Sequence, residues 1–185
     1  MNTDTKNTDI MLDLETMSTR PDAAIVAIGA VAFGEDGIGA RFYVPVSLET
    51  SVARGGVIDA GTVLWWMRQS DEARDLFRGS SCDILEALER FATFINDYTL
   101  GSKDVCVWGN GVDFDNVILA SAYVRAGLKM PWRYHHNRCY RTIKGSYPTI
   151  TADPFVGVKH NALADADNQA QHMLKILKIL RSTRS

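Results

Sequence analysis

Apolar runs separated by short polar turns predict three strands in the first part of the chain. Residues 10–12 form a short apolar run, and residues 24–33 form a longer one that is typical of a buried central strand. Residues 35–39 have the composition of a turn, and residues 41–46 are typical of a third strand. Because only short turns join these strands, we expect an antiparallel meander.

Helical periodicity dominates the remaining sequence. Residues 83–98 repeat their apolar side chains on one helical face behind a cap at Asp83, and Gly127 follows the end of a later helix. After the meander we expect helices at 62–69, 71–78 and 83–98, a strand at 105–108, a helix at 114–126, a strand at 138–143 and a helix at 161–181. This alternation predicts an α/β fold with a mixed sheet flanked by helices.

The sequence contains no repeat, linker or break in composition that would divide it. We expect a single domain over residues 9–181, a disordered tail at residues 1–8 and a short tail at residues 182–185. The 185 residues are 46% hydrophobic, which suits one sizeable core and excludes disorder for most of the chain. No stretch approaches the ~20 apolar residues of a membrane span. Residues 1–9 lack the features of a signal peptide, so we expect a cytoplasmic protein with no membrane partner.

Cysteine and charge usage narrow the chemistry further. The chain has three cysteines and no Cys-x-x-Cys pair, which argues against a disulfide framework and a structural zinc site. The formal charge of −2 hides a window, residues 116–152, that has six basic residues and no acidic one. Such segregation is typical of a protein with a polyanionic partner, although a solvated basic face produces the same pattern.

The first strand carries an unusual pair of acidic residues. Asp13 and Glu15 continue an apolar strand, and alternation places both carboxylates on one face of the sheet. Two like charges there repel each other and lose hydration, which a divalent cation held by oxygen ligands would reverse. Alternatively, both residues lie past the end of the strand as turn and cap residues.

Two further acidic clusters stand at predicted helix starts. Asp113 and Asp115 open the helix after the short strand, where they could also complement the helix dipole. His160 precedes the last helix, and Asp165 lies about one turn inside it among small apolar residues. His160 could equally be a surface residue, and Asp167 could be a solvated helix residue.

Taken together, these side chains suit a site with two metal ions. Such sites hold two cations ~3.5–4 Å apart, one beside the attacking water and one beside the leaving oxygen. A neutral histidine nearby can take the proton of that water, because its ordinary pKa is close to physiological pH.

Three motifs carry a resemblance to a known superfamily. Residues 13–16 match Asp-x-Glu-Thr, residues 110–115 match Asn-x3-Phe-Asp, and residues 160–165 match His-x4-Asp, with Ile-Gly-Ala-Val at residues 28–31. The chain therefore resembles the DEDDh branch of the DEDD, or DnaQ-like, 3′–5′ exonucleases over nearly its whole length. Residues 62–70 and the Arg-x-x-Arg-Thr at residues 138–142 look like the phage and bacterial exonucleases related to RNase T.

The resemblance implies an RNase H-like fold with a five-stranded mixed sheet and specific roles in the site. Two Mg²⁺ or Mn²⁺ ions would be held by four carboxylates, and His160 would be the general base. It favours Asp115 over Asp113, and Asp165 over Asp167. The implied catalytic residues are Asp13, Glu15, Asp115, His160 and Asp165, of which the four carboxylates are the metal ligands.

Substrate contacts are expected around these residues. The resemblance assigns Leu14, Thr16 and Met17 to the terminal nucleotide, and it adds Asn110. Trp65 and Trp66 are adjacent and point ~100° apart on a helix, so one can stack on a base, although packing of both in the core and its rim is the alternative. Arg138 and Arg141 are expected to bind the phosphate backbone, unless they pair with acidic residues of the same chain.

The expected reaction is hydrolysis of the terminal phosphodiester of single-stranded nucleic acid with a free 3′ end, releasing nucleoside 5′-monophosphates. DNA is slightly favoured. The alternatives are an RNA-specific 3′–5′ exoribonuclease with the same site and a catalytically silent nucleic-acid-binding module. A homodimer is suggested by the RNase T-like relatives alone.

Overall fold

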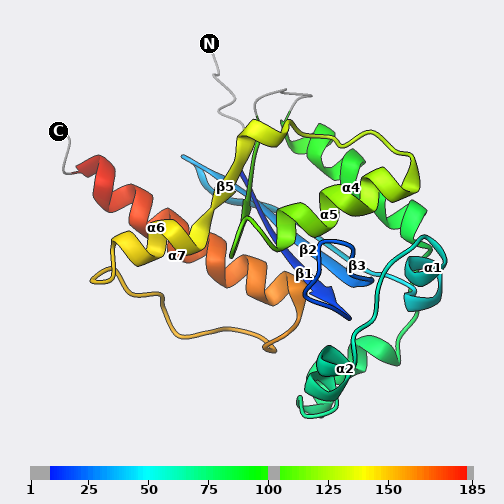
Figure 1. Cartoon of the computed structure of the whole chain (residues 1–185). Helices are drawn as coiled ribbons and strands as arrows, with labels where there is room; N and C mark the ends of the chain where they lie inside the picture. The colour runs from blue at the N-terminus through cyan, green and yellow to red at the C-terminus, as the bar shows by residue number, and fades with distance from the viewer. Residues whose placement is uncertain (1–8, 100–104, 183–185) are drawn as a thin grey trace.

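A five-stranded mixed sheet forms the centre of the protein in the computed structural model, which describes residues 9–99 and 105–182 (Figure 1). Its strand order is β3-β2-β1-β4-β5. The first three strands, β1 (Asp9–Thr16), β2 (Ile25–Gly34) and β3 (Gly37–Pro45), form the predicted antiparallel meander. β4 (Cys106–Gly109) and β5 (Asn137–Cys139) run parallel to β1.

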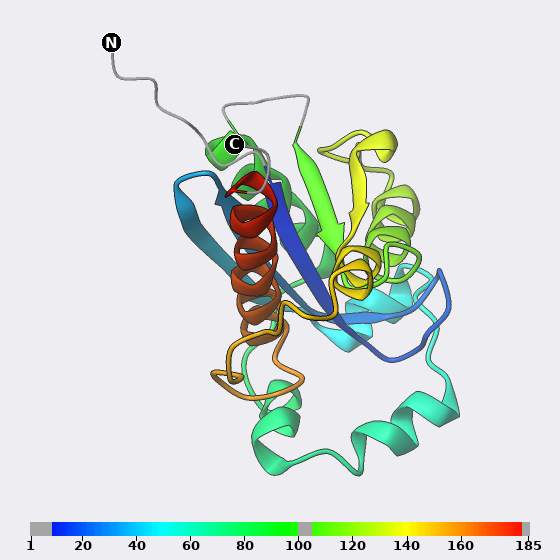
Figure 2. The same ribbon diagram turned by 90° about the vertical axis from the view of Figure 1, so that its left-hand side faces the viewer.

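Helices cover both faces of the sheet, as Figure 2 shows. The long helix α7 (Ala162–Ser182) packs on one face, where Met11, Val31 and Phe33 meet its Ala166, Ala170 and Met173. The helices α4 (Ile84–Thr99) and α5 (Asp115–Ala126) cover the opposite face, which contributes Ile10, Leu12 and Leu14. Alternate residues of β1 therefore face different helices, because successive strand side chains point to opposite sides.

A helical arm projects beyond the carboxyl end of β1. It consists of α2 (Ala60–Trp66), α3 (Asp71–Arg74) and the 3-10 helix η1 (Asp75–Phe77). A small core joins the arm to the sheet through Trp66 and Ala73 on the arm and Met17, Ala24 and Val26 on the body. The Trp66 indole also donates to the carbonyl of Thr16 at 2.9 Å. The arm is thus fastened at the end of the strand that carries Asp13 and Glu15.

The structure differs from the sequence prediction at three places. The helix predicted at 71–78 divides into α3 and η1, and a short helix, α1 (Leu48–Ala53), was not predicted; Ser47 caps it. The strand predicted at 138–143 is wrong: β5 ends at Cys139 and helix α6 (Tyr140–Ser146) follows. Tyr140 and Ile143, three residues apart, both pack against α7, and only helical spacing turns both toward the same neighbour.

Other predictions concerned the last helix, the two ends of the chain and membrane-spanning segments. The last predicted helix is observed as α7, which ends at Ser182. The residues assigned to tails, 1–8 and 183–185, lie outside the described residues. A short 3-10 helix, η2 (Tyr134–His136), precedes β5. Within residues 9–99 and 105–182, no helix is long and apolar enough to span a membrane.

Candidate active site

The parallel strands and two helix starts bring the predicted site residues to one edge of the sheet. β1 and β4 run in the same direction, so their carboxyl ends meet at this edge. α5 begins at Asp115 shortly after β4, and α7 begins at Ala162 beside the end of β1. Asp13 and Glu15 lie within β1 rather than beyond it, which excludes the interpretation of the pair as turn and cap residues.

Gly29 explains how α7 comes so close to Asp13. Gly29 is the β2 partner of Asp13 in the antiparallel register. A Cβ atom at this position would overlap the backbone of Ala162 and Leu163, so the first turn of α7 rests directly on the β2 backbone. The glycine of the Ile-Gly-Ala-Val motif thus permits the close approach that brings Asp165 to the β1 carboxylates.

Three carboxylates converge at this edge. Oxygen atoms of Asp13, Glu15 and Asp165 all lie within 4.8 Å of one another. Glu15 is buried, whereas Asp13 and Asp165 are half-buried. Hard carboxylate oxygens at this spacing are the ligands that Mg²⁺ and Mn²⁺ prefer, so the donor set fits a divalent cation.

Asp115 lies beside this group, and each of its carboxylate oxygens accepts a hydrogen bond from a backbone amide. Its Oδ1 accepts from the Leu14 amide at 3.2 Å, and its Oδ2 accepts from the Asn110 amide at 3.1 Å. The β1–β4 pairing ends at Leu12 and Gly109, so the Asp115 carboxylate receives the amide that a longer β4 would have paired. Asp115 is 3% exposed, while the neighbouring Asp113 is exposed.

Burial raises the pKa of all four carboxyl groups. Desolvation, reinforced by Asp165 and Asp115, raises the pKa of Glu15 to about 8. The pKa of Asp13 is raised well above its ordinary value by burial and then by its three acidic neighbours. Burial raises the pKa of Asp115 to about 7, although its two amide donors and Arg141 oppose the shift. Such repulsion among buried acids is what a bound cation would relieve.

The position of His160 is fixed by a hydrogen bond of its backbone amide and by the loop that precedes it. Its φ angle is 63°, in the left-handed region, and its amide donates to Asp165 Oδ2 at 2.8 Å. The loop before it is fastened to α7, because the Asn168 side chain both accepts from the Val156 amide and donates to the Val156 carbonyl. Strained backbone that is fixed by its neighbours is common at functional sites.

A cavity of about 650 Å³ opens over the carboxylates. Its walls come from β1, the arm, the loop after β4 and the start of α7. The lining residues are Asp13, Leu14, Glu15, Thr16, Thr19, Asp59, Gly61, Thr62, Trp65, Trp66, Asn110, Phe114, His160, Asp165 and Gln169. Four of the five predicted catalytic residues thus face one cavity, and Asp115 lies behind Leu14 and Asn110.

The two adjacent tryptophans have different environments. Trp66 is 4% exposed and packs in the core of the arm. Trp65 is 41% exposed, and its ring lies edge-on to His160 with centroids 4.8 Å apart. Trp65 is therefore the tryptophan with a free surface beside the candidate catalytic residues.

The other predicted contact residues are divided in position. Leu14, Thr16 and Asn110 line the cavity, whereas Met17 is buried in the core that joins the arm to the body. Arg141 follows β5 at the same edge, where its guanidinium packs against Gly111 and faces Asp115. Arg138 lies within β5, and its guanidinium turns back to the carbonyls of His135 and Asn137.

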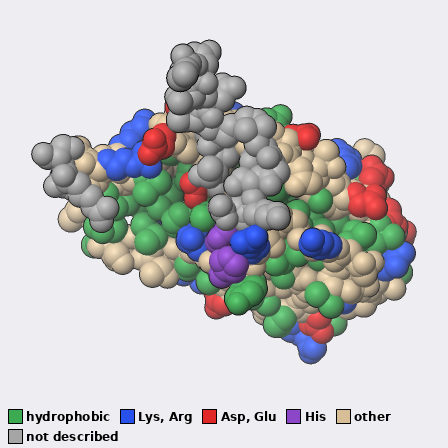
Figure 3. All heavy atoms as spheres, turned by 90° about the horizontal axis from the view of Figure 1, so that it is seen from above, with side chains coloured by type: hydrophobic (Ala, Val, Ile, Leu, Met, Phe, Trp, Pro, Cys, Tyr) green, Lys and Arg blue, Asp and Glu red, His purple; other side chains and the backbone are tan. Residues whose placement is uncertain are grey.

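The acid-free window is likewise split between the two ends of the sheet. Because β5 is parallel to β1, residues just before β5 lie at the end away from the cavity. Figure 3 views that end and shows histidine side chains beside lysine and arginine side chains. The rings of His135 and His136 lie edge-on to each other there, with centroids 4.4 Å apart. After β5, the window contributes Arg141, which packs against Gly111, and Lys144, which donates to Asn110 of the cavity lining.

Sequence reasoning gave no role in the site to Gln169, which lines the cavity, or to Lys144, which contacts the cavity residue Asn110. Gln169 lies one turn after Asp165 and donates to Asp13 Oδ1 at 2.9 Å. Lys144 Nζ donates to Asn110 Oδ1 at 3.3 Å and lies 4.9 Å from the centroid of the Tyr140 ring. For Gln169, the available signal was its spacing of four residues from Asp165. Lys144 lies in the acid-free window, residues 116–152.

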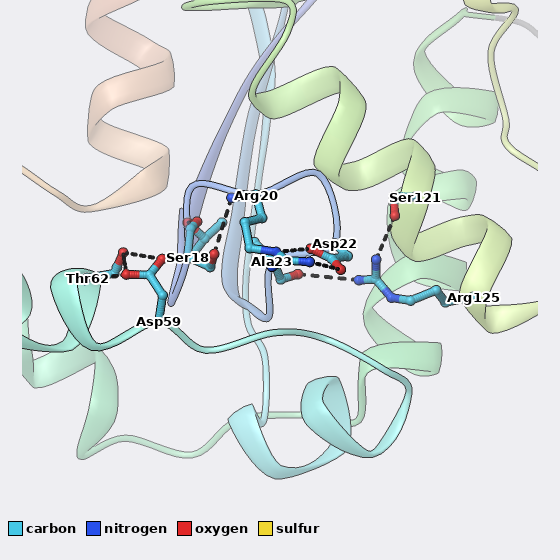
Figure 4. A network of polar contacts seen from close by, with 9 residues as sticks. Ser18, Arg20, Asp22, Ala23, Asp59, Thr62, Ser121 and Arg125 are labelled. Carbon is cyan, nitrogen blue, oxygen red and sulfur yellow. Dashed lines mark hydrogen bonds and ion pairs between the residues drawn. The ribbon is translucent and has the colours of Figure 1, made fainter.

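A polar network fixes the loop that follows β1, as Figure 4 shows. On one side Asp59 caps α2 by accepting from the Thr62 amide at 2.9 Å. On the other side the Arg125 guanidinium of α5 donates to the Ala23 carbonyl at 3.3 Å and to Ser121. The Asp59 amide also donates to the Met17 carbonyl at 3.0 Å. The loop is thus tied to both the arm and α5, which orders the floor of the cavity.

Asp167 has a different task from Asp165. It pairs with Arg41 of β3 at 2.6 Å and accepts from Gln171 at 2.6 Å, both on the surface. This position separates it from the carboxylate cluster, in keeping with the predicted choice of Asp165.

The sheet order and the acidic cavity at its carboxyl edge agree with the RNase H-like fold of solved exonucleases, and the family match places the chain in the DnaQ-like class of 3′–5′ exonucleases. Within it, the chain belongs to the family described as 3′-5′ exoribonuclease Rv2179c-like domain, which matches residues 8–177. The superfamily and the fold predicted from the three motifs are confirmed.

Individual relatives are distant. An exodeoxyribonuclease of Enterobacteria phage T4 is 24% identical in an alignment of 121 positions that covers 60% of this chain and 53% of the relative. The match thus spans about half the length of that protein. Escherichia coli exonuclease I, solved with a dT13 oligonucleotide, superposes with a TM-score of 0.63 at 17% identity, over 92% of this chain and 40% of that one. Cell-death related nuclease 4 gives a TM-score of 0.55 at 14% identity, over 94% and 64% of the two chains.

Proposed function

We propose that the protein is a metal-dependent 3′–5′ exonuclease that removes nucleoside 5′-monophosphates from single-stranded nucleic acid. The observation that carries the proposal is the convergence of Asp13, Glu15 and Asp165 within 4.8 Å in a cavity that also holds His160. The burial of neighbouring acids is costly for the fold, and a bound cation would offset that cost.

Asp13, Glu15, Asp115 and Asp165 are the proposed ligands of two Mg²⁺ or Mn²⁺ ions. Such ions supply Lewis-acid stabilisation of the charge on the reacting phosphate. The Leu14 and Asn110 amides hold the Asp115 carboxylate beside the other three acids. The DEDDh assignment, which adds His160 to the four carboxylates, is part of this proposal.

His160 is the proposed general base. Its place on the cavity wall beside Asp165 suits the removal of a proton from an attacking water. The water oxygen then bonds to phosphorus, and the bond from phosphorus to the 3′ oxygen of the preceding nucleotide breaks; that oxygen leaves with the electron pair and takes up a proton from solvent. The products are a nucleoside 5′-monophosphate and a strand with a new 3′ hydroxyl.

The terminal nucleotide is proposed to lie between the arm and the end of β1. Leu14, Thr16 and Asn110 line this space, and Trp65 offers an exposed ring on which a base can stack. Arg141 stands at the edge and is the proposed phosphate contact from the basic window. Arg138 and Met17 would act only indirectly from their observed positions.

We favour DNA as the polymer. The phage relative is named an exodeoxyribonuclease, and exonuclease I was solved with oligodeoxynucleotides. The second candidate is an exoribonuclease, which the family description favours. The two differ in the 2′-hydroxyl, and a direct comparison of substrates decides between them. A homodimer and a cytoplasmic location stay predictions.

The test uses 5′-labelled single-stranded DNA and RNA of equal sequence, incubated with the protein and Mn²⁺ or Mg²⁺. We expect a ladder that shortens from the 3′ end, faster on DNA, with nucleoside 5′-monophosphates released. EDTA and the Asp165→Asn variant should both abolish it. Binding without a ladder on either polymer would overturn the proposed activity in favour of a silent binding module.

A further inference from the structure

The amide of Gln169 makes an unusual bond across the site. Gln169 stands on α7, and its Nε2 donates to Asp13 Oδ1 of β1 at 2.9 Å. An ionised carboxylate, the form that binds a cation, only accepts hydrogen bonds, so in that form the NH₂ group of the amide faces Asp13. One bond thereby joins the helix that carries Asp165 to the strand that carries Asp13.

This bond leaves the other end of the same amide without a partner. Gln169 is 9% exposed, and its Oε1 is a buried acceptor with no hydrogen bond among the described residues. Unpaired buried acceptors are rare because each loses its hydration without compensation. A residue selected for stability alone at this position would be apolar, like its buried neighbours Ala166, Ala170 and Met173.

The position of Gln169 on α7 gives the bond its geometric effect. Gln169 follows Asp165 by four residues, so both side chains lie on one helical face above β1. The amide fixes Asp13 Oδ1 from the side of α7, while the oxygens of Glu15 and Asp165 lie within 4.8 Å of an Asp13 oxygen. Rotation of the Asp13 carboxylate away from the other two would break this bond.

We propose that Gln169 is a positioning residue, which holds the Asp13 carboxylate in the orientation that a divalent cation requires. This inference rests on the proposed function. Groups that orient metal ligands in this way typically change metal affinity by about 10- to 100-fold when they are removed.

The proposal is tested with Gln169→Leu, which keeps the approximate volume and removes both amide atoms. Gln171→Leu is the matched control, because Gln171 is exposed on the same helix and its amide donates to the Asp167 carboxylate at 2.6 Å. Mn²⁺ affinity is measured by titration calorimetry, and thermal unfolding is followed in EDTA. We expect Gln169→Leu to bind Mn²⁺ about 10- to 100-fold more weakly while it unfolds at the wild-type temperature or above. Gln171→Leu should match the wild type in affinity.

The outcomes separate positioning from a structural role. Wild-type Mn²⁺ affinity in Gln169→Leu would overturn the inference and leave the proposed function intact. Weaker binding together with a lower unfolding temperature in EDTA would also overturn it, because loss of structure would then explain the affinity. Gln169→Asn, whose amide is one methylene too short to reach Asp13, provides the measurement if the leucine variant does not fold. A wild-type protein that takes up no Mn²⁺ would remove the proposed function and this inference together.

Discussion

Trp65 and Trp66 are adjacent on a short helix, but their side chains have different environments. Their ring centroids are 5.0 Å apart, yet Trp66 anchors the arm through its bond to the Thr16 carbonyl, and Trp65 presents its ring to the cavity. Adjacency in the sequence indicates that the two point apart, but it does not say which of them faces the body. That choice depends on where the arm docks, which is a tertiary property.

We expect Trp65→Ala to weaken binding of single-stranded oligonucleotides by about 5- to 150-fold, because stacking on one base is worth ~1–3 kcal/mol. The measurement is the dissociation constant of a labelled oligonucleotide in Ca²⁺, which replaces the catalytic ions. Met67→Ala is the control, since Met67 is 64% exposed and does not line the cavity. Equal losses in both variants would argue against stacking on Trp65.

Glu15 is the buried acid whose removal should help the metal-free protein. Its pKa of about 8 reflects burial beside Asp165 and Asp115, and the neutral amide of Glu15→Gln avoids this cost. We expect the variant to unfold at a higher temperature than the wild type in EDTA at pH 8, and to lose the stabilisation by Mn²⁺. Glu89→Gln, an exposed change on α4, should alter neither property. Stabilisation by Mn²⁺ that survives Glu15→Gln would exclude Glu15 as a ligand.

At the scale of elements, the sequence predicts most strands and helices but not how closely they approach. The β1–β2–β3 meander, α4, β4, α5 and α7 follow from apolar periodicity and caps. The strand predicted at 138–143 is wrong. Tyr140 and Ile143 are typical of a strand by composition, but their packing against α7 favours a helix. Asp13, Asp115, His160 and Asp165 are predictable because motif spacing identifies them. Gln169 belongs to none of the motifs: its spacing from Asp165 places it on the same helical face, but only the structure shows that its neighbour is Asp13.

Gly29 sets the distance between α7 and the sheet. We expect Gly29→Ala to destabilise the protein by about 1–3 kcal/mol, because a Cβ atom there overlaps the Ala162 backbone and pushes the first turn of α7 away. Activity should fall further than stability, since Asp165 moves with that turn. Urea unfolding and the nuclease assay measure the two effects.

Gly145→Ala provides the matched control for this substitution. Gly145 lies in α6 with no atom within 4 Å of an added Cβ, so the change should stabilise the protein by up to about 1 kcal/mol through helix propensity. Gly29→Ala with wild-type stability and activity would show that α7 adjusts without cost.

At the scale of the whole molecule, the acidic site couples stability to pH. The pKa of Glu15 is raised from 4.5 to about 8, so the folded, metal-free protein keeps a proton that the unfolded chain releases across that window. The folded state binds more protons there, and the free energy of unfolding therefore falls as pH rises from 4.5 to 8. Asp115, with a pKa of about 7, acts in the same direction.

We expect the stabilisation by Mn²⁺ to depend on pH in the opposite direction. The cation displaces these protons, so its stabilising effect should grow with pH over the same window. Thermal unfolding in EDTA and in Mn²⁺, at pH 4.5 and at pH 8, measures both trends. An unfolding temperature in EDTA that rises steadily between these two values would contradict the buried, protonated state of Glu15.

The spacing of the four carboxylates along the chain has a mechanical consequence. Asp115 follows Glu15 by 100 residues, and Asp165 follows Asp115 by 50. A cation held jointly by these side chains pins β1 to the starts of α5 and α7 and closes two long loops of chain, much as a disulfide does, but reversibly. Removal of the ion by a chelator is then equivalent to breaking a cross-link. Proteases should reach the loop before His160 more readily in EDTA than in Mn²⁺, so the ion would protect the enzyme from degradation as well as serve its chemistry.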